Sequence, residues 1–390
     1  MLRFLRTTAI VLAITAGLYT GLDYVVGLWR YNNLNVAIAD GSTIPAYRNQ
    51  PYMSEDFIRE KALEPGEWQQ VKGQSLVTPP EYHGSYFNID KLDPTGNFYR
   101  RTSNPPPNGK PDRVILLIGG STLYGPEVPD DYTLASQLSK RLNALDPAHR
   151  YVVYNAGVVA ADSAQDRDRL TYELSRGLKP YMVIAVDGPL DLVYGVYQGH
   201  PGQPAPLLAA RSGFRGFIHK YLPTNIAEIV HLWFHDRAVD RNNMQAPKQL
   251  ASQPVTVNLT EVTTGLYTKN LQAMEKIAAG ADARFLAVLP PSPYSTTYDN
   301  PGDDLTVAKR NTDRQMPKLG SILERDQPVL SAILVKQKAA GMEVLDLSAA
   351  LKAKTENVFI DQGHLNGTGY GLLAEPIAQA VLTSKTAAQP

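Results

Sequence analysis

The sequence contains no cysteine, and its net charge is zero. Without cysteine the chain can form no disulfide, use no thiolate nucleophile and build no cysteine-ligated metal site, although this absence does not identify a cellular compartment. Lys plus Arg and Asp plus Glu number 38 each, so no strong net field attracts nucleic acid or an acidic membrane surface. We therefore expect no nucleic-acid partner.

Length and composition indicate a folded protein. With 390 residues, of which 43% are hydrophobic and 19% charged, the chain can bury a full core and hold one large domain with attachments.

The N-terminus resembles a membrane anchor. Arg3 and Arg6 precede a stretch, residues 7–28, that is apolar except for Asp23, and about 20 such residues cross a bilayer. A cleaved signal peptide ending near Ala16 is the alternative. We favour an uncleaved anchor over residues 1–30, because the apolar character resumes in "YVVGLW" and no clear A-x-A cleavage site is present. The rest of the chain would then lie outside the cytoplasm.

The next segment, residues 31–110, has no sustained helical or alternating pattern and is rich in Pro, Asn, Gly and Tyr. Structureless runs much longer than about 15 residues are uncommon in compact proteins. We therefore expect an irregular membrane-proximal segment that packs on the following domain.

From residue 111 to about 385 short apolar runs alternate with helical patterns. The predicted strands are "RVILLI" (113–118), "YVVYNAG" (151–157), "YMVIAV" (181–186), "RFLAVLP" (284–290) and "MEVLDL" (342–347). The predicted helices cover residues 132–145, capped by Asp130 or Asp131, then 163–177, 261–279, 319–340 and 367–382. Continuous apolar strands between helices indicate a parallel sheet with helices on both faces, an α/β sandwich.

The alternation breaks between residues 197 and 257, which we interpret as an insertion. Residues 225–236, "NIAEIVHLWFHD", have the pattern of an amphipathic helix. The insertion either controls access to a site or is inert packing. His231 and His235 are four positions apart, a spacing that suits zinc, but no HExxH pattern or third ligand accompanies them, so we predict no metal site.

The stretch "LLIGGSTLYG" places Ser121 immediately after the first strong strand. Ligands of open parallel sheets bind outside the carboxyl ends of strands, and Gly119 and Gly120 permit a tight turn that exposes a serine hydroxyl. An ordinary turn is the alternative, because a serine needs an adjacent base before it can attack. A phosphate-binding loop is excluded, since no G-K-[ST] follows.

A candidate base lies near the other end of the chain. Asp361 and His364 are three residues apart, after the last strand and before the last helix. In a turn this spacing lets the carboxylate hold one imidazole nitrogen while the other faces a nucleophile. A lone Asp-x-x-His is more often a capping Asp beside a surface His. The serine on a glycine turn of the same sheet favours the catalytic interpretation.

Four stretches, "GGSTLYG", "NAGVVAADSAQD", "VDGPLDL" and "DQGHLNGTGYGLLA", resemble in order and spacing the four sequence blocks of the SGNH (GDSL-like) hydrolases. The resemblance covers about residues 111–196 and 340–382. It implies a flavodoxin-like three-layer α/β/α sandwich with a parallel sheet, and ester hydrolysis through an acyl-enzyme without a cofactor. It assigns Ser121 as nucleophile, His364 as general base and Asp361 as its orienting partner.

The oxyanion site departs from the family pattern. The resemblance implies that the N–H groups of Ser121 and Gly157 bind the oxyanion, but the third block, usually Gly-x-Asn-Asp, has Leu190 where the donor Asn belongs, followed by Asp191. Leucine donates no hydrogen bond, and one lost oxyanion donor costs about 100-fold to 1000-fold in turnover. Asn155 or a residue of the insertion could substitute. We include Asp191 with Asn155 among the candidate oxyanion and substrate-binding residues.

The sequence thus predicts a serine esterase held at the bacterial inner membrane by one helix, with its catalytic domain in the periplasm. Related anchored proteins act on O-acyl groups of cell-surface polysaccharides, so we expect an acetylated exopolysaccharide or another ester as substrate. Two alternatives stay open. One is an O-acyltransferase that works beside polysaccharide synthesis machinery, and the other is a catalytically weak subunit that binds glycan or a partner.

Overall fold

The computed structural model describes residues 44–63, 69–70, 76–92, 95–110, 112–201 and 258–383, with four single positions nearer the N-terminus. Apart from those four positions, the predicted anchor over residues 1–30 lies outside the described residues. In the part of the chain that is described, no helix combines the length and the apolar character needed to cross a membrane.

The centre of the fold is a parallel sheet. Its five strands are β6 (Asp112–Gly119), β7 (Arg150–Asn155), β8 (Met182–Val186), β9 (Arg284–Leu289) and β10 (Glu343–Asp346). They lie in the spatial order β7-β6-β8-β9-β10, and each neighbouring pair is parallel. In chain order this is 2-1-3-4-5, the strand order of flavodoxin-like sheets. The five predicted strands and the α/β class are confirmed.

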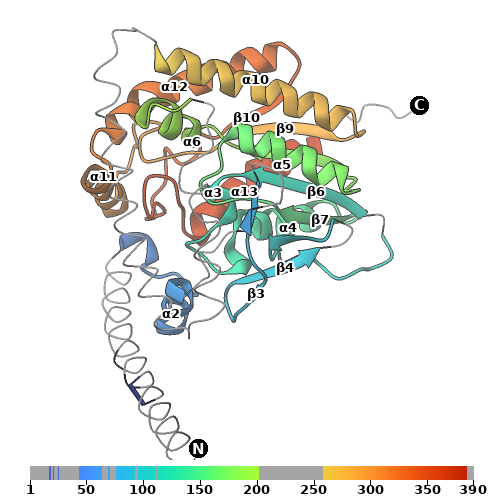
Figure 1. Cartoon of the computed structure of the whole chain (residues 1–390), viewed down its shortest axis with the longest axis horizontal. Helices are drawn as coiled ribbons and strands as arrows, with labels where there is room; N and C mark the ends of the chain where they lie inside the picture. The colour runs from blue at the N-terminus through green and yellow to red at the C-terminus, as the bar shows by residue number, and fades with distance from the viewer. Residues whose placement is uncertain are drawn as a thin grey trace, which may run out of the picture.

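Helices cover both faces of the sheet (Figure 1). The helices on one face are α4 (Leu134–Leu145) and α13 (Gly367–Thr383), and those on the other are α5 (Ser163–Ser175), α10 (Leu259–Ala279) and α12 (Leu319–Ala339). Successive strand residues point to opposite faces. Ile115 and Leu117 of β6 therefore enter the first core, whereas Leu116 and Ile118 enter the second. The resulting three layers match the predicted sandwich.

The prediction that residues 31–110 are irregular is wrong in part. Three strands of this segment, β5 (Asn97–Arg100), β4 (Asn88–Leu92) and β3 (Tyr82–His83), extend the sheet beyond β7 in antiparallel pairing. A buried ion pair fixes this extension, because Arg100 Nε lies 2.5 Å from Asp130 Oδ1. The segment also forms the short helices η1 (Pro45–Tyr47) and α2 (Glu55–Leu63) and the two-residue strands β1 (Gln69–Gln70) and β2 (Val77–Thr78). Residues of η1 and α2 belong to the first core, so these two helices pack on the domain.

The predicted cap of α4 is also wrong. The Thr133 side chain accepts a hydrogen bond from the Ser136 N–H at 3.2 Å, and Thr133 is therefore the N-cap. The Asp130 carboxylate instead binds Arg100 and Asn88, which draws it away from the helix.

The chain between β8 and α10 begins with α6 (Pro189–Leu192) and the π-helical turn η3 (Val193–Tyr197). Most of the predicted insertion, including the expected helix over residues 225–236 with His231 and His235, lies outside the described residues. The sequence did not predict α11 (Asp303–Gln315), which lies between β9 and α12.

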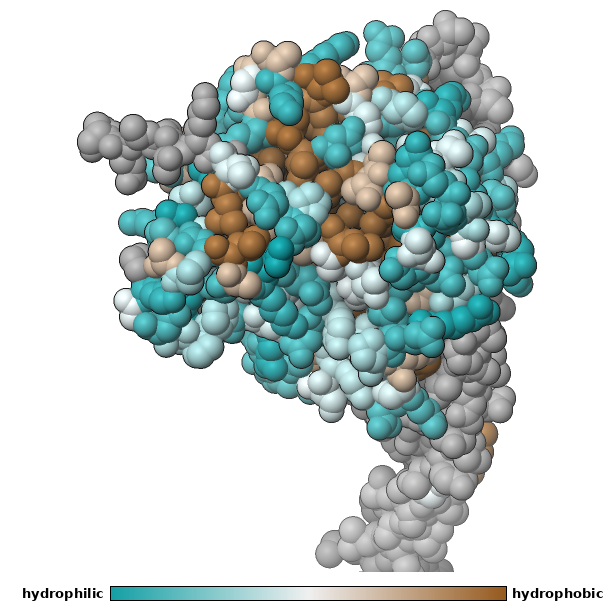
Figure 2. Space-filling model, turned by 180° about the vertical axis from the view of Figure 1, so that it is seen from behind, coloured by the Kyte–Doolittle hydropathy of each residue, from teal (hydrophilic) through white to brown (hydrophobic). Residues whose placement is uncertain are grey.

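The face turned away from the viewer in Figure 1 carries apolar patches among hydrophilic side chains (Figure 2). Among the described residues of the folded domain, the exposed large apolar side chains are Val262, Val329, Val335 and Leu372. Single exposed apolar residues are normal on soluble domains, and these residues identify no function.

Candidate active site

Ser121 lies where β6 ends. It is the first residue of the four-residue helix α3 (Ser121–Tyr124), which follows directly on the glycine pair. A β-carbon at Gly119, whose φ is +156°, would lie 2.5 Å from Val186 O, and one at Gly120 would lie 3.1 Å from Ala161 O. The turn therefore requires two glycines, and it presents the serine at the carboxyl edge of the sheet, where parallel sheets bind ligands.

Asp361 and His364 share a tight turn between β10 and α13. Asp361 Oδ1 accepts hydrogen bonds from the N–H groups of Gly363 and His364, both at 2.8 Å. This Asp turn leaves the second oxygen, Oδ2, 2.6 Å from His364 Nδ1. The same loop is tied to α3, because Thr122 Oγ1 donates to Gly363 O at 2.7 Å. The aspartate thus shapes the turn and holds the imidazole.

The structure brings all three predicted catalytic residues together. His364 Nε2 lies 2.8 Å from Ser121 Oγ, although 243 positions separate the two residues. The side chains of His364 and Asp361 are 17% and 27% exposed, so the site is partly shielded yet reachable. A serine hydroxyl, an imidazole and a carboxylate in this order form the arrangement that activates a serine for attack on a carbonyl carbon.

The charges of the pair are set by their mutual contact. Burial raises the pKa of Asp361, but the charge and hydrogen bond of His364, with the two backbone N–H groups, lower it to about 2. Burial lowers the pKa of His364, but the charge and hydrogen bond of Asp361, with a contribution from Glu127, raise it above 6.5. Asp361 is therefore a carboxylate at neutral pH, and it stabilises the imidazolium that forms when His364 takes the serine proton.

A buried ion pair anchors the loop that carries this pair. Asp304 Oδ2 accepts the N–H groups of Val358 and Phe359 at 2.9 and 3.0 Å, and its Oδ1 lies 3.0 Å from Lys354 Nζ. The N-terminal segment braces the far side of the loop, where the Tyr52 hydroxyl accepts from the Gly367 N–H at 3.1 Å. Asp304 and Tyr52, together with Thr122 of α3, thus fix the position of the loop that carries His364.

Two predicted oxyanion donors are engaged elsewhere. The Gly157 N–H donates to Asn155 Oδ1 at 3.1 Å, and Asn155 Nδ2 donates to Leu123 O at 3.1 Å. A β-carbon at Gly157 would lie 2.6 Å from the Tyr124 nitrogen, which places Gly157 against the end of α3 that is farther from Ser121. The structure therefore uses Gly157 and Asn155 to hold α3, and their role as oxyanion donors stays a prediction. The Ser121 N–H has no hydrogen-bond partner among the described residues and is free to bind an oxyanion.

Leu190 and Asp191 also differ from expectation. The Leu190 side chain packs against Gly120, beside the serine, and offers no hydrogen-bond donor there. Asp191 points away and accepts hydrogen bonds from Ser163 Oγ at 2.5 Å and Ser163 N at 3.3 Å. Burial, with the charges of Asp187 and Asp162, raises the pKa of Asp191 well above its usual range. Asp191 therefore stabilises the start of α5, and its place among the oxyanion and substrate-binding residues stays a prediction.

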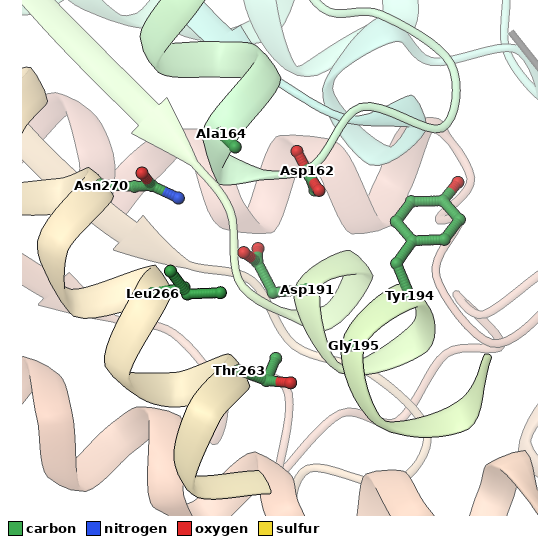
Figure 3. Close-up of a pocket in the computed structure, with 8 residues that line it drawn as sticks. All are labelled: Asp162, Ala164, Asp191, Tyr194, Gly195, Thr263, Leu266 and Asn270. Carbon is green, nitrogen blue, oxygen red and sulfur yellow. The ribbon is translucent and has the colours of Figure 1, made fainter. Parts of the chain in front are cut away.

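Asp191 faces a small polar pocket between α5, η3 and α10 (Figure 3). The pocket is lined by Asp162, Ala164, Asp191, Tyr194, Gly195, Thr263, Leu266 and Asn270. Asp162 and Asp191 both turn toward its centre (Figure 3). It contains none of the three residues of the Ser–His–Asp arrangement.

Three residues near His364 were not predicted. Glu127 follows α3. One of its carboxylate oxygens lies within 4.8 Å of an Asp361 carboxylate oxygen and of a His364 ring nitrogen. Lys61 of α2 and Tyr47 of η1 both bind Glu127 Oε2 at 2.6 Å. These groups fit a hydrogen-bonded network better than a metal centre, because both His364 nitrogens and Glu127 Oε2 already have protein partners.

No protein-family model matches the sequence, and no curated protein matches it. Solved structures of similar arrangement include an acetyl xylan esterase, AlAXEase, with 13% identity over 69% of this chain and 99% of that chain and a TM-score of 0.40. TesA has 14% identity over 69% and 98%, with a TM-score of 0.37. A member of the lipolytic G-D-S-L family from Veillonella parvula has 11% identity over 70% and 100%, with a TM-score of 0.38. The strand order and the Ser–His–Asp geometry, not these distant similarities, are the basis of the function proposed below.

Proposed function

We propose that the protein is a serine esterase of the SGNH type that removes O-acyl groups through an acyl-enzyme. The observation that carries this proposal is the hydrogen-bonded series Ser121–His364–Asp361 at the carboxyl edge of the parallel sheet. The four sequence blocks that resemble SGNH hydrolases support the same assignment, because three of them lie at the ends of β6, β7 and β8 and the fourth carries His364.

The reaction follows from this arrangement. Ser121 Oγ attacks the carbonyl carbon of the ester while His364 Nε2 takes its proton, and the Ser121 N–H binds the oxyanion that forms. The imidazolium then gives its proton to the departing alkoxide, which leaves an acyl-serine. Water, deprotonated by His364, attacks the acyl-serine and releases the carboxylic acid, and the proton returns to Ser121 Oγ.

We propose an acetylated cell-surface polysaccharide or exopolysaccharide as substrate, reached from the inner membrane on the periplasmic side. The anchor-like sequence of residues 1–30 supports this location, and anchored members of the family that the blocks resemble act on such acyl groups. The enzyme would then work next to polysaccharide synthesis machinery.

A serine-reactive fluorophosphonate tests the chemistry on the full-length protein. We expect the probe to label the wild-type protein and Ser175→Ala, which changes an exposed serine, but not Ser121→Ala. Acetate release from an acetylated polysaccharide should show the same dependence on Ser121. A folded wild-type protein that is neither labelled nor able to release acetate would contradict the proposal. Acetyl groups that reappear on an added oligosaccharide would instead indicate an O-acyltransferase.

The oxyanion site favours a second candidate, a catalytically weak subunit that binds glycan or a partner. Leu190 offers no donor, and Gly157 and Asn155 are engaged elsewhere. This candidate requires very low turnover from a correctly folded protein, an outcome that the measurement of acetate release distinguishes.

A further inference from the structure

A second carboxylate lies beside the catalytic histidine and has no part in the reaction derived above. A Glu127 oxygen, an Asp361 oxygen and a His364 nitrogen all lie within 4.8 Å of one another. The Glu127 side chain is only 16% exposed, so solvent screens its charge weakly. Glu127 therefore acts on the charge of the imidazole.

A lysine from a distant part of the chain compensates this carboxylate. Lys61 Nζ lies 2.6 Å from Glu127 Oε2, and the lysine side chain is 30% exposed. The Tyr47 hydroxyl donates to the same oxygen at 2.6 Å. Both partners belong to the N-terminal segment, in η1 and α2, whereas Glu127 follows α3.

The other groups that face the pair are neutral tyrosines. Burial raises the pKa values of Tyr47, Tyr52 and Tyr370 far above the physiological range, and nearby carboxylates raise them further. The charges that act on the imidazole from the elements packed around it therefore come from Asp361, Glu127 and Lys61. The two carboxylates favour the protonated ring and the ammonium opposes it.

We propose that the Lys61–Glu127 ion pair sets the pH range in which His364 can accept the Ser121 proton. The N-terminal segment is then part of the catalytic unit, because it supplies the positive member of the pair. This inference rests on the proposed function, and Glu127 and Lys61 act through His364 as positioning residues rather than by contact with the reacting atoms.

Each single substitution should move the titration midpoint of His364, the pH at which its imidazole is half protonated, in a defined direction. Lys61→Met leaves the Glu127 charge uncompensated, which stabilises the imidazolium and should raise the midpoint by about one pH unit. Glu127→Gln keeps the shape of the side chain, removes the negative charge and should lower the midpoint by about the same amount. The double variant restores a neutral pair of side chains, so its midpoint should return close to that of the wild type.

Two measurements on the full-length protein test this. The first is the NMR titration of histidine ring carbons, with the His364 signal identified by its loss in His364→Gln. The second is the pH dependence of the rate at which a fluorophosphonate labels Ser121. The exposed pair Lys309–Glu324, at 3.2 Å, provides matched controls. Lys309→Met and Glu324→Gln should leave both midpoints unchanged.

Opposite shifts in the two single variants that cancel in the double variant would support the inference. Unchanged midpoints in folded single variants, with labelling still dependent on Ser121, would overturn the inference and leave the proposed function intact. A wild-type protein that is not labelled would overturn the proposed function, while the NMR titration would still show whether the ion pair controls the charge of His364.

Discussion

The Leu190 side chain packs directly against Gly120, the residue that precedes Ser121. An apolar side chain thus occupies the space beside the nucleophile from which an amide could stabilise the oxyanion. Because Gly157 and Asn155 hold α3, the Ser121 N–H is the member of the predicted set that remains free for this task.

Leu190→Asn should therefore increase turnover. An amide at this position can donate to the oxyanion, and one such donor contributes about 100-fold or more to kcat in enzymes that have it. Hydrolysis of a small acetyl ester measures the change. Leu190→Ala is the control, since it makes space without adding a donor and should give no comparable gain. An equal gain in the alanine variant would show that Leu190 limits access and not oxyanion binding.

The activity should depend on pH through His364. The imidazole must be neutral to take the serine proton. Burial lowers the pKa of His364, but the charge and hydrogen bond of Asp361, with the charge of Glu127, raise it on balance. Below that pKa, kcat/KM should fall about tenfold for each pH unit, because the profile of kcat/KM reports the free enzyme. A rate profile between about pH 5 and 9 on a small ester provides the measurement. A kcat/KM that does not fall toward acid pH would contradict the assignment of His364 as base.

The regular strands of the fold could be predicted because their signal is local. Continuous apolar runs such as Ile115–Ile118 are long enough to identify a buried strand without knowledge of its partners. Strands β3, β4 and β5 were missed for the opposite reason. They are two to five residues long, and β5 is held by the burial of Arg100 against Asp130, 30 positions away. No pattern within residues 97–100 reveals such a partner.

The active site shows the same difference between features with a local sequence signal and features that depend on distant contacts. Ser121 and the Asp361–His364 turn stand at strand and helix boundaries, where glycine pairs and short spacings leave a signal in the sequence. The partner of the Gly157 N–H could not be predicted, because it depends on the course of the turn, which brings Gly157 to Asn155 Oδ1. Lys61 and Glu127 were missed because α2 and the residue after α3 meet only in the folded chain.

Asp304 should be essential for the stability of the protein, because it anchors the loop that carries His364. The Lys354–Asp304 pair is almost completely buried, with side chains 1% and 0% exposed. Asp304→Ala leaves the lysine charge uncompensated and two backbone N–H groups without an acceptor, and breaking such a pair costs about 3–5 kcal/mol of unfolding free energy. Urea denaturation measures the loss. The control is Glu324→Gln in the exposed pair with Lys309, which should change stability by less than about 0.5 kcal/mol. Equal stabilities of the two variants would contradict this role.

A second group of carboxylates, on the α5 face of the sheet, should make stability depend on pH. Asp166 and Asp187 are 1% and 3% exposed, and their side chains hydrogen-bond to each other. Burial raises the pKa of Asp166 to about 7, and burial with the charge of Asp166 raises the pKa of Asp187 well above its usual range. The folded protein therefore holds protons on this pair that the unfolded chain releases near pH 4.

Since the folded state binds more protons than the unfolded state between about pH 4 and 7, the contribution of this pair to stability falls as pH rises through that window. Asp166→Asn removes the titrating group, so we expect it to stabilise the protein at pH 8 relative to the wild type and to reduce the difference between pH 5 and pH 8. Urea denaturation at both values measures the effect. Asp168→Asn, which changes an aspartate of the same helix with a side chain 43% exposed, should leave the pH dependence unchanged. A pH dependence of Asp166→Asn equal to that of the wild type would show that the carboxylates of this pair are already compensated in the folded protein.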